Sequence, residues 1–503
     1  MMPSRQLDPA PMRVARFSGC GGVRLQLGAE TLAQRRQSKS TSGSRQAMEP
    51  VPGTPRSTIV CPRCWPKRPG LRRLPARPRA RHTARVSEPQ HPYDVLEYES
   101  SPIEWLSPER LALASLLHGG PRVKLEGYRY LELGCGNGAN LVPLAFYRPH
   151  AHVVGLDASP AASGAVRRKA ETLGLGNLTT LEADLAEPGG LDGTFDFIVA
   201  HGVFSWVAEA TRLQLLQLCQ RHLAPHGLLY LSYNARPGWD VRGIVRAFLV
   251  EHTLDNDGLP DRARLAQRLA ATLIPPLREA EHPFSKLLAT ELELVRDAHS
   301  SYVGHDYLAE DNHAFWRREF LALLAAHGFS HVADADFNYD SGRVSDTIID
   351  GVHGLELPTR ALHDAIDLLA YRQFHCPLLT RAPWVPADMT AAEFAALHVA
   401  SCLALQPGRR HFSHPSGYEV DASEEPMRQA LLQLAPRWPR GMPLARLFSD
   451  PDVVREDLLL LHKSGLLELR CSEPTDSIDA TRLRALEHSQ GYHTTPWHIR
   501  VSA

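Results

Sequence analysis

A glycine-rich turn after a short apolar run is the feature that most constrains this sequence. In YRYLELGCGNGANL (128–141), Gly134, Gly136 and Gly138 directly follow the strand-like run that ends at Leu133. Glycine adopts positive φ and lets the backbone approach a ligand closely. A helix that starts behind such a turn offers free N–H groups and the positive end of its dipole. The pattern predicts a strand, a ligand-binding turn and a helix.

Alternating strands and helices continue after this turn. Four more strand-like runs follow, namely HVVGLD (152–157), NLTTLEAD (177–184), FDFIVAHGV (195–203) and GLLYLSYN (227–234). This order predicts an α/β fold, a Rossmann-like doubly wound sheet with ligands at the carboxyl ends of its strands. Asp157 ends the second strand, where a carboxylate accepts both hydroxyls of a ribose. Asp196 begins the fourth strand, and we expect it to stabilise the strand or its loop.

Two cofactors fit this arrangement. Read loosely, Gly134, Gly136 and Ala139 match the dinucleotide pattern GxGxxG/A, which alone is weak. The strict alternation G-C-G-N-G, with Glu132 two residues before it and Asp184 at a later strand end, favours S-adenosylmethionine. This is the ExGxGxG pattern of class I methyltransferases, which the chain resembles here.

The resemblance extends to a particular family. HGVFSWV (201–207), LAPHGLLYLSYNARPGW (223–239), GHDYLAEDNHAFWRREFLALLAAHGF (304–329) and YRQFHCPLL (371–379) resemble bacterial class I methyltransferases with a methyltransferase regulatory domain. Relatives often read HGVYSWV at the first segment, where this chain has Phe204. The family includes bacterial protein-lysine methyltransferases that modify outer-membrane proteins. The resemblance therefore implies a methyltransferase, and it implies a protein amine as the methyl acceptor.

The expected cofactor site combines the turn and the acidic strand ends. Asp157 should hold the ribose, Asp184 should face the adenine, and the backbone of the turn should hold the methionine part. The predicted cofactor-binding residues are Glu132, Gly134, Cys135, Gly136, Gly138, Asp157, Ala158, Asp184 and Leu185. We see no spacing of His, Cys or acidic residues that suggests a metal.

The expected acceptor site follows the fourth and fifth strands. His201 is a candidate for orienting the cofactor or taking a proton, because imidazole titrates near neutral pH. A structural histidine is the equally weighted alternative. Tyr233 and Asn234 are the other predicted catalytic residues, as hydrogen-bonding partners of an amine. The predicted substrate-binding residues are Trp206 and Trp239, through cation–π contact, and His305 and Tyr307. Buried tryptophans often only fill a core.

Apolar periodicity divides the rest of the chain. We expect a methyltransferase domain over 91–340 with a helical regulatory or cap insert at about 245–312, and a sixth strand within 325–337. A linker over 341–359, a winged-helix-like α+β domain over 360–473 and a mobile tail over 474–503 should follow. A winged helix often binds DNA, but basic residues are few here, so protein contact is expected.

The first ninety residues differ in composition from the rest. Residues 1–90 carry 18 Lys and Arg against 4 Asp and Glu, and 61–86 are rich in Arg and Pro. This composition predicts an unstructured basic leader, or translation from too early a start codon. The leader is the only part of the chain that we expect to contact nucleic acid. Cys61 and Cys64 are too few ligands for a structural zinc site. The eight scattered cysteines and the lack of a membrane-spanning run suggest a cytoplasmic protein of unknown oligomeric state.

Three functions remain open from the sequence. The first is an S-adenosylmethionine-dependent methyltransferase of a protein side-chain amine, for which the family resemblance implies lysine. The second is a small-molecule methyltransferase with the same cofactor site and a different acceptor. The third is a non-catalytic interaction protein built on this fold.

Overall fold

The structure is a computed structural model, and it describes residues 24–27, 92–98, 100–256, 258–335, 351–352, 354, 357–406, 411–422, 425–473, 480–494 and 500–501. The central feature is a seven-stranded sheet with the strand order β4-β3-β2-β5-β6-β11-β9. Its members are β2 (Arg129–Leu133), β3 (His152–Asp157), β4 (Leu178–Glu182), β5 (Phe195–Ala200), β6 (Leu223–Leu231), β9 (Phe329–Asp334) and β11 (Pro377–Arg381). The first five are parallel, and β11 runs antiparallel between β6 and β9.

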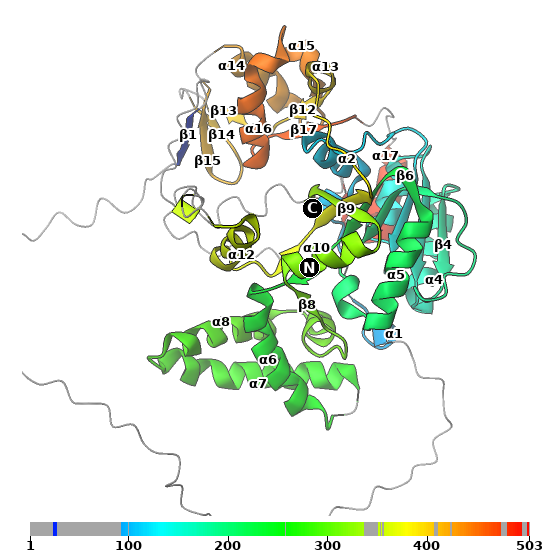
Figure 1. The fold of residues 1–503 in the computed structure, drawn as a ribbon, viewed down its shortest axis with the longest axis vertical. Helices are drawn as coiled ribbons and strands as arrows, with labels where there is room; N and C mark the ends of the chain where they lie inside the picture. The colour runs from blue at the N-terminus through cyan, green and yellow to red at the C-terminus, as the bar shows by residue number, and fades with distance from the viewer. Residues whose placement is uncertain are drawn as a thin grey trace, which may run out of the picture. The chain divides into compact units, whose positions relative to one another are not determined.

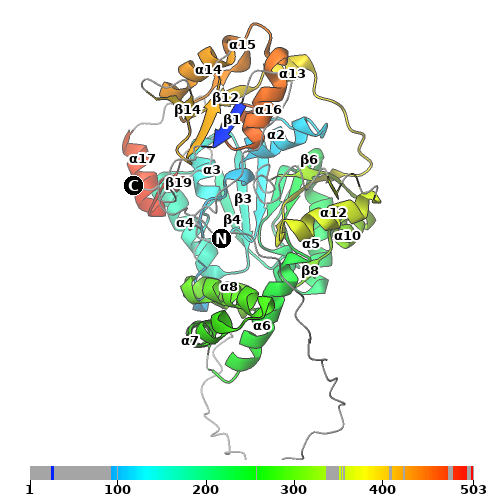
Figure 2. The same cartoon turned by 90° about the vertical axis from the view of Figure 1, so that its left-hand side faces the viewer.

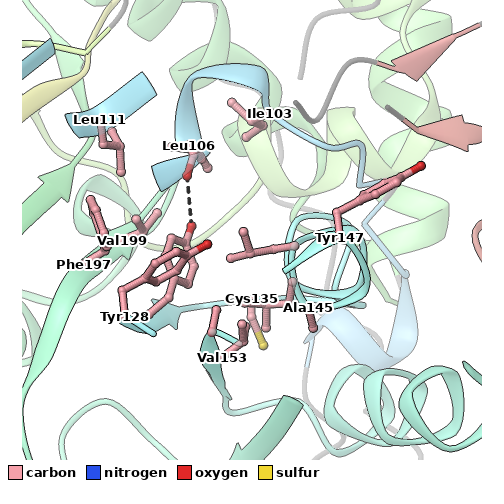
Figure 3. Close-up of a cluster of buried hydrophobic side chains, with 14 of the residues drawn as sticks. Ile103, Leu106, Leu111, Tyr128, Cys135, Ala145, Tyr147, Val153, Phe197 and Val199 are labelled. Atoms are coloured by element: carbon pink, nitrogen blue, oxygen red, sulfur yellow. Dashed lines mark hydrogen bonds between the residues drawn. The ribbon is translucent and has the colours of Figure 1, made fainter. Parts of the chain in front are cut away.

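Apolar side chains alternate along the strands and form one core on each face of the sheet. One face packs against α2 (Pro108–Leu117), α3 (Leu141–Tyr147) and α4 (Pro160–Leu173). Figure 3 shows part of this core, with Tyr128 and Phe197 beside residues of the segment that precedes α2. The other face packs against α5 (Glu209–His222) and α10 (Arg317–Ala326). Figure 2 shows helices on both sides of the sheet, which is the doubly wound arrangement predicted from the sequence.

Local sequence signals explain where the cofactor-side helices start. Ser159 accepts a hydrogen bond from the N–H of Ala162 at 3.0 Å, and Pro160 occupies the first helical position of α4. Gly174 ends the same helix with φ +63°. α4 therefore starts at a capped residue that the local sequence determines.

A helical insert, defined here as residues 238–307, separates β6 from the last strands of the sheet. It contains α6 (Gly238–Thr253), α7 (Leu259–Glu279), α8 (Pro283–Asp297), α9 (Ser300–Tyr302) and the π-helical turn η3 (Val303–Tyr307). These helices bury a core of their own around Leu249, Ala266 and Val295. Figure 1 shows the three long helices grouped together. The insert begins a few residues earlier than the sequence predicts.

The sheet is completed only after the insert, by the strand β11, which the sequence analysis places in the C-terminal domain. Residues 377–381 were expected within the C-terminal domain, but β11 pairs with β6 and β9. The two-residue strand β10 (Phe374–His375) also pairs with β7 (Tyr233–Ala235), next to the end of β6. The domain boundary predicted at 360 is therefore wrong for these residues. The reason is that a short apolar run carries no local sign of the distant strand with which it pairs.

The C-terminal residues form a separate core. The strands β12 (His398–Ala400), β16 (Met442–Pro443) and β17 (Glu468–Arg470) pair with one another. The helices α13 (Ala391–Ala395), α14 (Met427–Leu434), α15 (Leu444–Leu447) and α16 (Arg455–Lys463) pack beside these strands. β12 follows α13 and precedes the other three helices, and the winged-helix interpretation stays a prediction.

Two segments predicted to lack structure contain regular elements. In the leader, Arg24–Leu27 forms β1, which pairs with β15 (Tyr418–Asp421). In the tail, α17 (Ala480–Gln490) buries Leu486 against the α3–α4 core. Both predictions are wrong for these residues, because backbone pairing and one apolar helix face offset their polar composition. Cys61, Cys64 and residues 336–350 lie outside the described residues.

Candidate functional site

The glycine turn has the geometry expected of a ligand cradle. Gly134, Gly136 and Gly138 all have positive φ, at +70°, +53° and +78°. A Cβ on Gly134 would lie 2.5 Å from Val203, so a larger residue would collide there. A Cβ on Gly136 would meet nothing closer than Ser100 Oγ at 3.4 Å. The backbone at Gly136 is therefore accessible to a ligand.

Asp157 organises this cradle from the end of β3. Its Oδ2 accepts the N–H of Gly136 at 2.8 Å, and its Oδ1 accepts the N–H of Ser159 at 2.9 Å. These two bonds fix the carboxylate between the glycine turn and the start of α4. The neighbouring Ala158 is exposed at the same edge. The predicted roles of both residues stay predictions, and the geometry is compatible with them.

Glu132 is buried next to the turn and is hydrogen-bonded to Asn140. Its Oε1 accepts Asn140 Nδ2 at 2.9 Å, and Asn140 Oδ1 accepts the N–H of Ile103 at 2.7 Å. Burial raises the pKa of Glu132 to about 8, although the Asn140 bond lowers it. Glu132 Oε2 has no partner among the described residues. This side chain therefore ties the turn to Asn140.

The remaining predicted cofactor residues divide into exposed and buried ones. Cys135 is buried, and its Sγ would lie 2.8 Å from a Cβ on Gly155, so its side chain belongs to the core. Asp184 is exposed after β4 and accepts the N–H of Ala186 at 2.8 Å. Leu185 packs against the α5–α10 core.

Asp196 accepts the N–H of Arg129 at 2.8 Å, which confirms its predicted structural role.

His201 lies at the carboxyl end of β5 in an aromatic setting. Its Nδ1 is 2.9 Å from the hydroxyl of Tyr230, which accepts Trp105 Nε1 at 3.2 Å. Phe374 contacts the imidazole edge-on, with ring centroids 5.4 Å apart. Burial lowers the pKa of His201 to about 3. The ring is neutral at physiological pH and suits hydrogen bonding better than accepting a proton from an ammonium group.

Tyr233 and Asn234 do not point into the same space. The Tyr233 ring is buried and stacks on Phe320 with centroids 3.8 Å apart and on His375 at 5.3 Å. These contacts place it in the core and weaken its predicted catalytic role. The N–H of Asn234 donates to Ser205 Oγ at 2.8 Å. Asn234 Nδ2 is buried without a partner among the described residues, so a donor remains there for a ligand.

The two tryptophans predicted to bind the substrate lie together, but the ring of one of them already contacts an arginine. The rings of Trp206 and Trp239 meet edge-to-face at 5.6 Å. The Arg242 guanidinium lies 5.0 Å from the centre of the Trp239 ring, and Trp239 Nε1 donates to Asn312 at 2.9 Å. Trp239 therefore serves chiefly as a partner of Arg242. Trp206 is partly exposed, and its role as an acceptor contact stays a prediction.

His305 and Tyr307 belong to the insert. His305 stacks on Tyr93 with ring centroids 4.1 Å apart, and Tyr307 is fully buried beside Arg242. Their contacts differ from those of Asn234 and Trp206, and burial weakens their predicted role as acceptor contacts.

Sequence reasoning missed Tyr230, Trp105 and the segment around Tyr93. Tyr230 lies on β6 with its ring on the same face as Val199. The alternation within GLLYLSYN could have distinguished Tyr230 from Tyr233 as the partner of His201. Trp105 gave no signal, because its contact with Tyr230 joins residues 125 positions apart.

Family models match two parts of the chain. Residues 131–229 match the methyltransferase domain family, and residues 299–381 match the predicted methyltransferase regulatory domain. The second match ends at the last residue of β11, so the sheet and the regulatory segment share that strand. The accessible backbone at Gly136 and the carboxylate of Asp157 fit S-adenosylmethionine as a ligand.

Similar proteins are bacterial. An uncharacterized protein of Rickettsia prowazekii is 32% identical over 248 residues, 49% of this chain and 45% of that protein. This chain thus spans about half the length of that relative. Trans-aconitate 2-methyltransferase of Deinococcus radiodurans is 35% identical over 105 residues, 21% of this chain and 37% of that protein.

A solved structure shares the fold over most of the chain. PKMT2 of Rickettsia typhi in complex with AdoHcy matches with a TM-score of 0.67 and 18% identity, over 81% of this chain and 86% of that one. The strand order of the sheet and the two family matches agree with this fold. The chain therefore contains a class I methyltransferase domain, whose cofactor is S-adenosylmethionine, followed by a methyltransferase regulatory domain.

Proposed function

We propose that this protein transfers a methyl group from S-adenosylmethionine to a lysine side chain of a protein. The observation that carries the proposal is the architecture shared with PKMT2, a protein lysine methyltransferase, over 81% of this chain. That likeness includes much more than the 99-residue methyltransferase match and so extends beyond the cofactor domain. The resemblance of residues 201–207, 223–239 and 304–329 to a family that includes protein-lysine methyltransferases supports the same acceptor.

The chain supplies binding, alignment and a dry environment. S-adenosylmethionine, when bound, supplies an activated methyl group with its own leaving group. Gly136 and Asp157 would hold it, and His201, Trp206 and Asn234 follow the carboxyl ends of β5 and β6 in the chain. An attacking amine must be unprotonated, and burial among aromatic rings disfavours an ammonium ion. The neutral His201 ring adds a polar contact without adding positive charge.

The acceptor is tested directly with labelled cofactor. The full chain is incubated with methyl-labelled S-adenosylmethionine and a bacterial lysate, and the products are separated by size and digested for mass spectrometry. Label on lysine of protein supports the proposal, and label confined to low-mass products overturns it. A chain that binds AdoHcy but labels neither fraction would favour the non-catalytic alternative.

A small acidic molecule is the second candidate acceptor. Arg242 Nη2 and Asn312 Nδ2 are buried donors without a partner among the described residues, and both lie beside Trp239. Such donors suit acid oxygens. Replacing Asn312 by Ala should weaken labelling of a small acid, whereas labelling of lysine does not need this donor.

A further inference from the structure

The segment from Pro92 to Tyr98, called here the N-terminal strap, contacts both the cofactor side of the sheet and the insert. It begins with the short helix α1 (Pro92–Val95). α1 lies against α4, which starts directly after Asp157, and also against α7 of the insert (Figure 1). Nothing in the sheet itself requires such a segment.

The strap contacts the cofactor cradle at two places. Asp94 Oδ1 accepts a hydrogen bond from Ser159 Oγ, two residues after Asp157. Asn137, between two glycines of the turn, donates from Nδ2 to Glu97 Oε1 at 3.5 Å. Just beyond the strap, Ser100 Oγ is the atom closest to a Cβ built on Gly136. The strap therefore lies along the turn and the ribose end together.

The strap is held on its other side by the insert residues Gly304 to Asp306. His305 stacks on Tyr93 with planes 2° apart, and its Nε2 is 2.6 Å from the carbonyl oxygen of Leu96. Tyr98 donates to Asp306 Oδ2 at 3.3 Å.

The backbone at this contact is itself unusual. Gly304 lies against the Leu96 side chain, 2.7 Å from the position that a Cβ would take. His305 and Asp306 belong to η3, and π-helical turns are rare and frequent at functional sites. An insert that served only as a surface bundle would not need the π turn at this point.

We propose that the N-terminal strap closes over the bound cofactor and that His305 and Asp306 hold it closed, so that the insert controls cofactor exchange. A nucleoside bound at Asp157 and Gly136 lies between residues that the strap contacts, so it cannot leave while these contacts hold. Opening requires the bonds at Leu96 and Tyr98 to break. His305 and Asp306 are positioning residues in this account, and the inference rests on the proposed function for its cofactor.

The test measures the binding and release of AdoHcy, not turnover. Titration calorimetry gives Kd, and stopped-flow displacement gives the dissociation rate for the full chain and for Tyr98→Phe and His305→Ala. The loss of one hydrogen bond, worth roughly 1 kcal/mol, should raise the dissociation rate about fivefold in each variant. His226→Ala replaces an exposed histidine of β6 and should leave the rate unchanged. Hydrogen exchange should show that AdoHcy protects residues 92–98 in the wild type.

The outcomes separate this inference from the proposed function. If the wild type binds no AdoHcy, the proposed function fails. If it binds AdoHcy, but both variants release it at the wild-type rate, the strap is refuted. Should His305→Ala fail to fold, Tyr98→Phe decides alone, because it removes only a hydroxyl group. Absence of protection over 92–98 on binding also overturns the proposal.

Discussion

Replacing Glu132 by Gln should stabilise the protein increasingly as the pH rises. Glu132 is 4% exposed, and burial holds its pKa near 8 instead of 4.5. Its Oε1 accepts a hydrogen bond from Asn140, which the carbonyl group of Gln can accept equally well. In the wild type, the folded state retains this proton over a pH range in which the unfolded chain has lost it. Stability that depends on the protonated carboxyl is therefore lost between pH 4.5 and about 8.

The magnitude follows from the slope of this loss. One proton retained only by the folded state changes the free energy of unfolding by about 1.4 kcal/mol per pH unit. Between pH 6 and pH 8, the advantage of Glu132→Gln over the wild type should therefore grow by about 2 to 3 kcal/mol. The contributions of the other titrating groups cancel in this difference, because both proteins carry these groups.

Urea unfolding of the ligand-free protein, followed by circular dichroism at the two pH values, measures this difference. Glu126→Gln is the matched control, since it makes the same replacement at an exposed residue just before β2. An advantage of Glu132→Gln that is equal at pH 6 and pH 8 would refute the reasoning. It would mean that Glu132 is ionised in the folded protein.

Three further predictions concern the site and its supports. Asp157→Ala should weaken AdoHcy binding at least tenfold by calorimetry, because charged hydrogen bonds contribute about 1.5–3 kcal/mol; unchanged affinity would exclude a ribose contact. His201 and His462 have pKa values lowered by burial to about 3 and about 4, so the unfolded chain gains their protons first as the pH falls. Their contribution to the free energy of unfolding should decrease from about pH 6.5 downward, so below this pH His462→Phe should gain stability relative to the wild type; a difference that does not vary with pH would contradict this. Arg242→Met should destabilise the protein by about 3–5 kcal/mol in urea unfolding, because it leaves Glu291 charged and buried, while Arg242→Met combined with Glu291→Leu should recover much of the loss. A single variant as stable as the wild type would disprove that Glu291 depends on this cation.

Local patterns predicted the part of the fold that local physics determines. The glycine turn, β3 at 152–157 and the cap at Ser159 could be read directly, because φ limits, apolar alternation and capping act within a few residues. The sixth strand and the insert were also found from periodicity. β11 was not, because its place in the sheet depends on partners about 50 and 150 residues away.

The site shows the same division. Asp157 and the glycines lie where the sequence places them, since each follows a strand directly. Tyr233 and Trp239 were sensible candidates by position, but packing decides the environment of a side chain, and their contacts with Phe320 and Arg242 are set by distant elements. Tyr93 and Trp105 act through contacts across more than a hundred residues, which periodicity does not report.

The antiparallel strand β11 has a consequence for how the protein is made. During synthesis, the edge of β6 stays unpaired until residues 377–381 leave the ribosome, long after the cofactor turn has emerged. An exposed edge invites wrong pairing, so the nascent chain needs the regulatory segment to finish its own catalytic sheet. A shortened gene that stops after β6 or β9 should therefore yield aggregates and not a minimal enzyme.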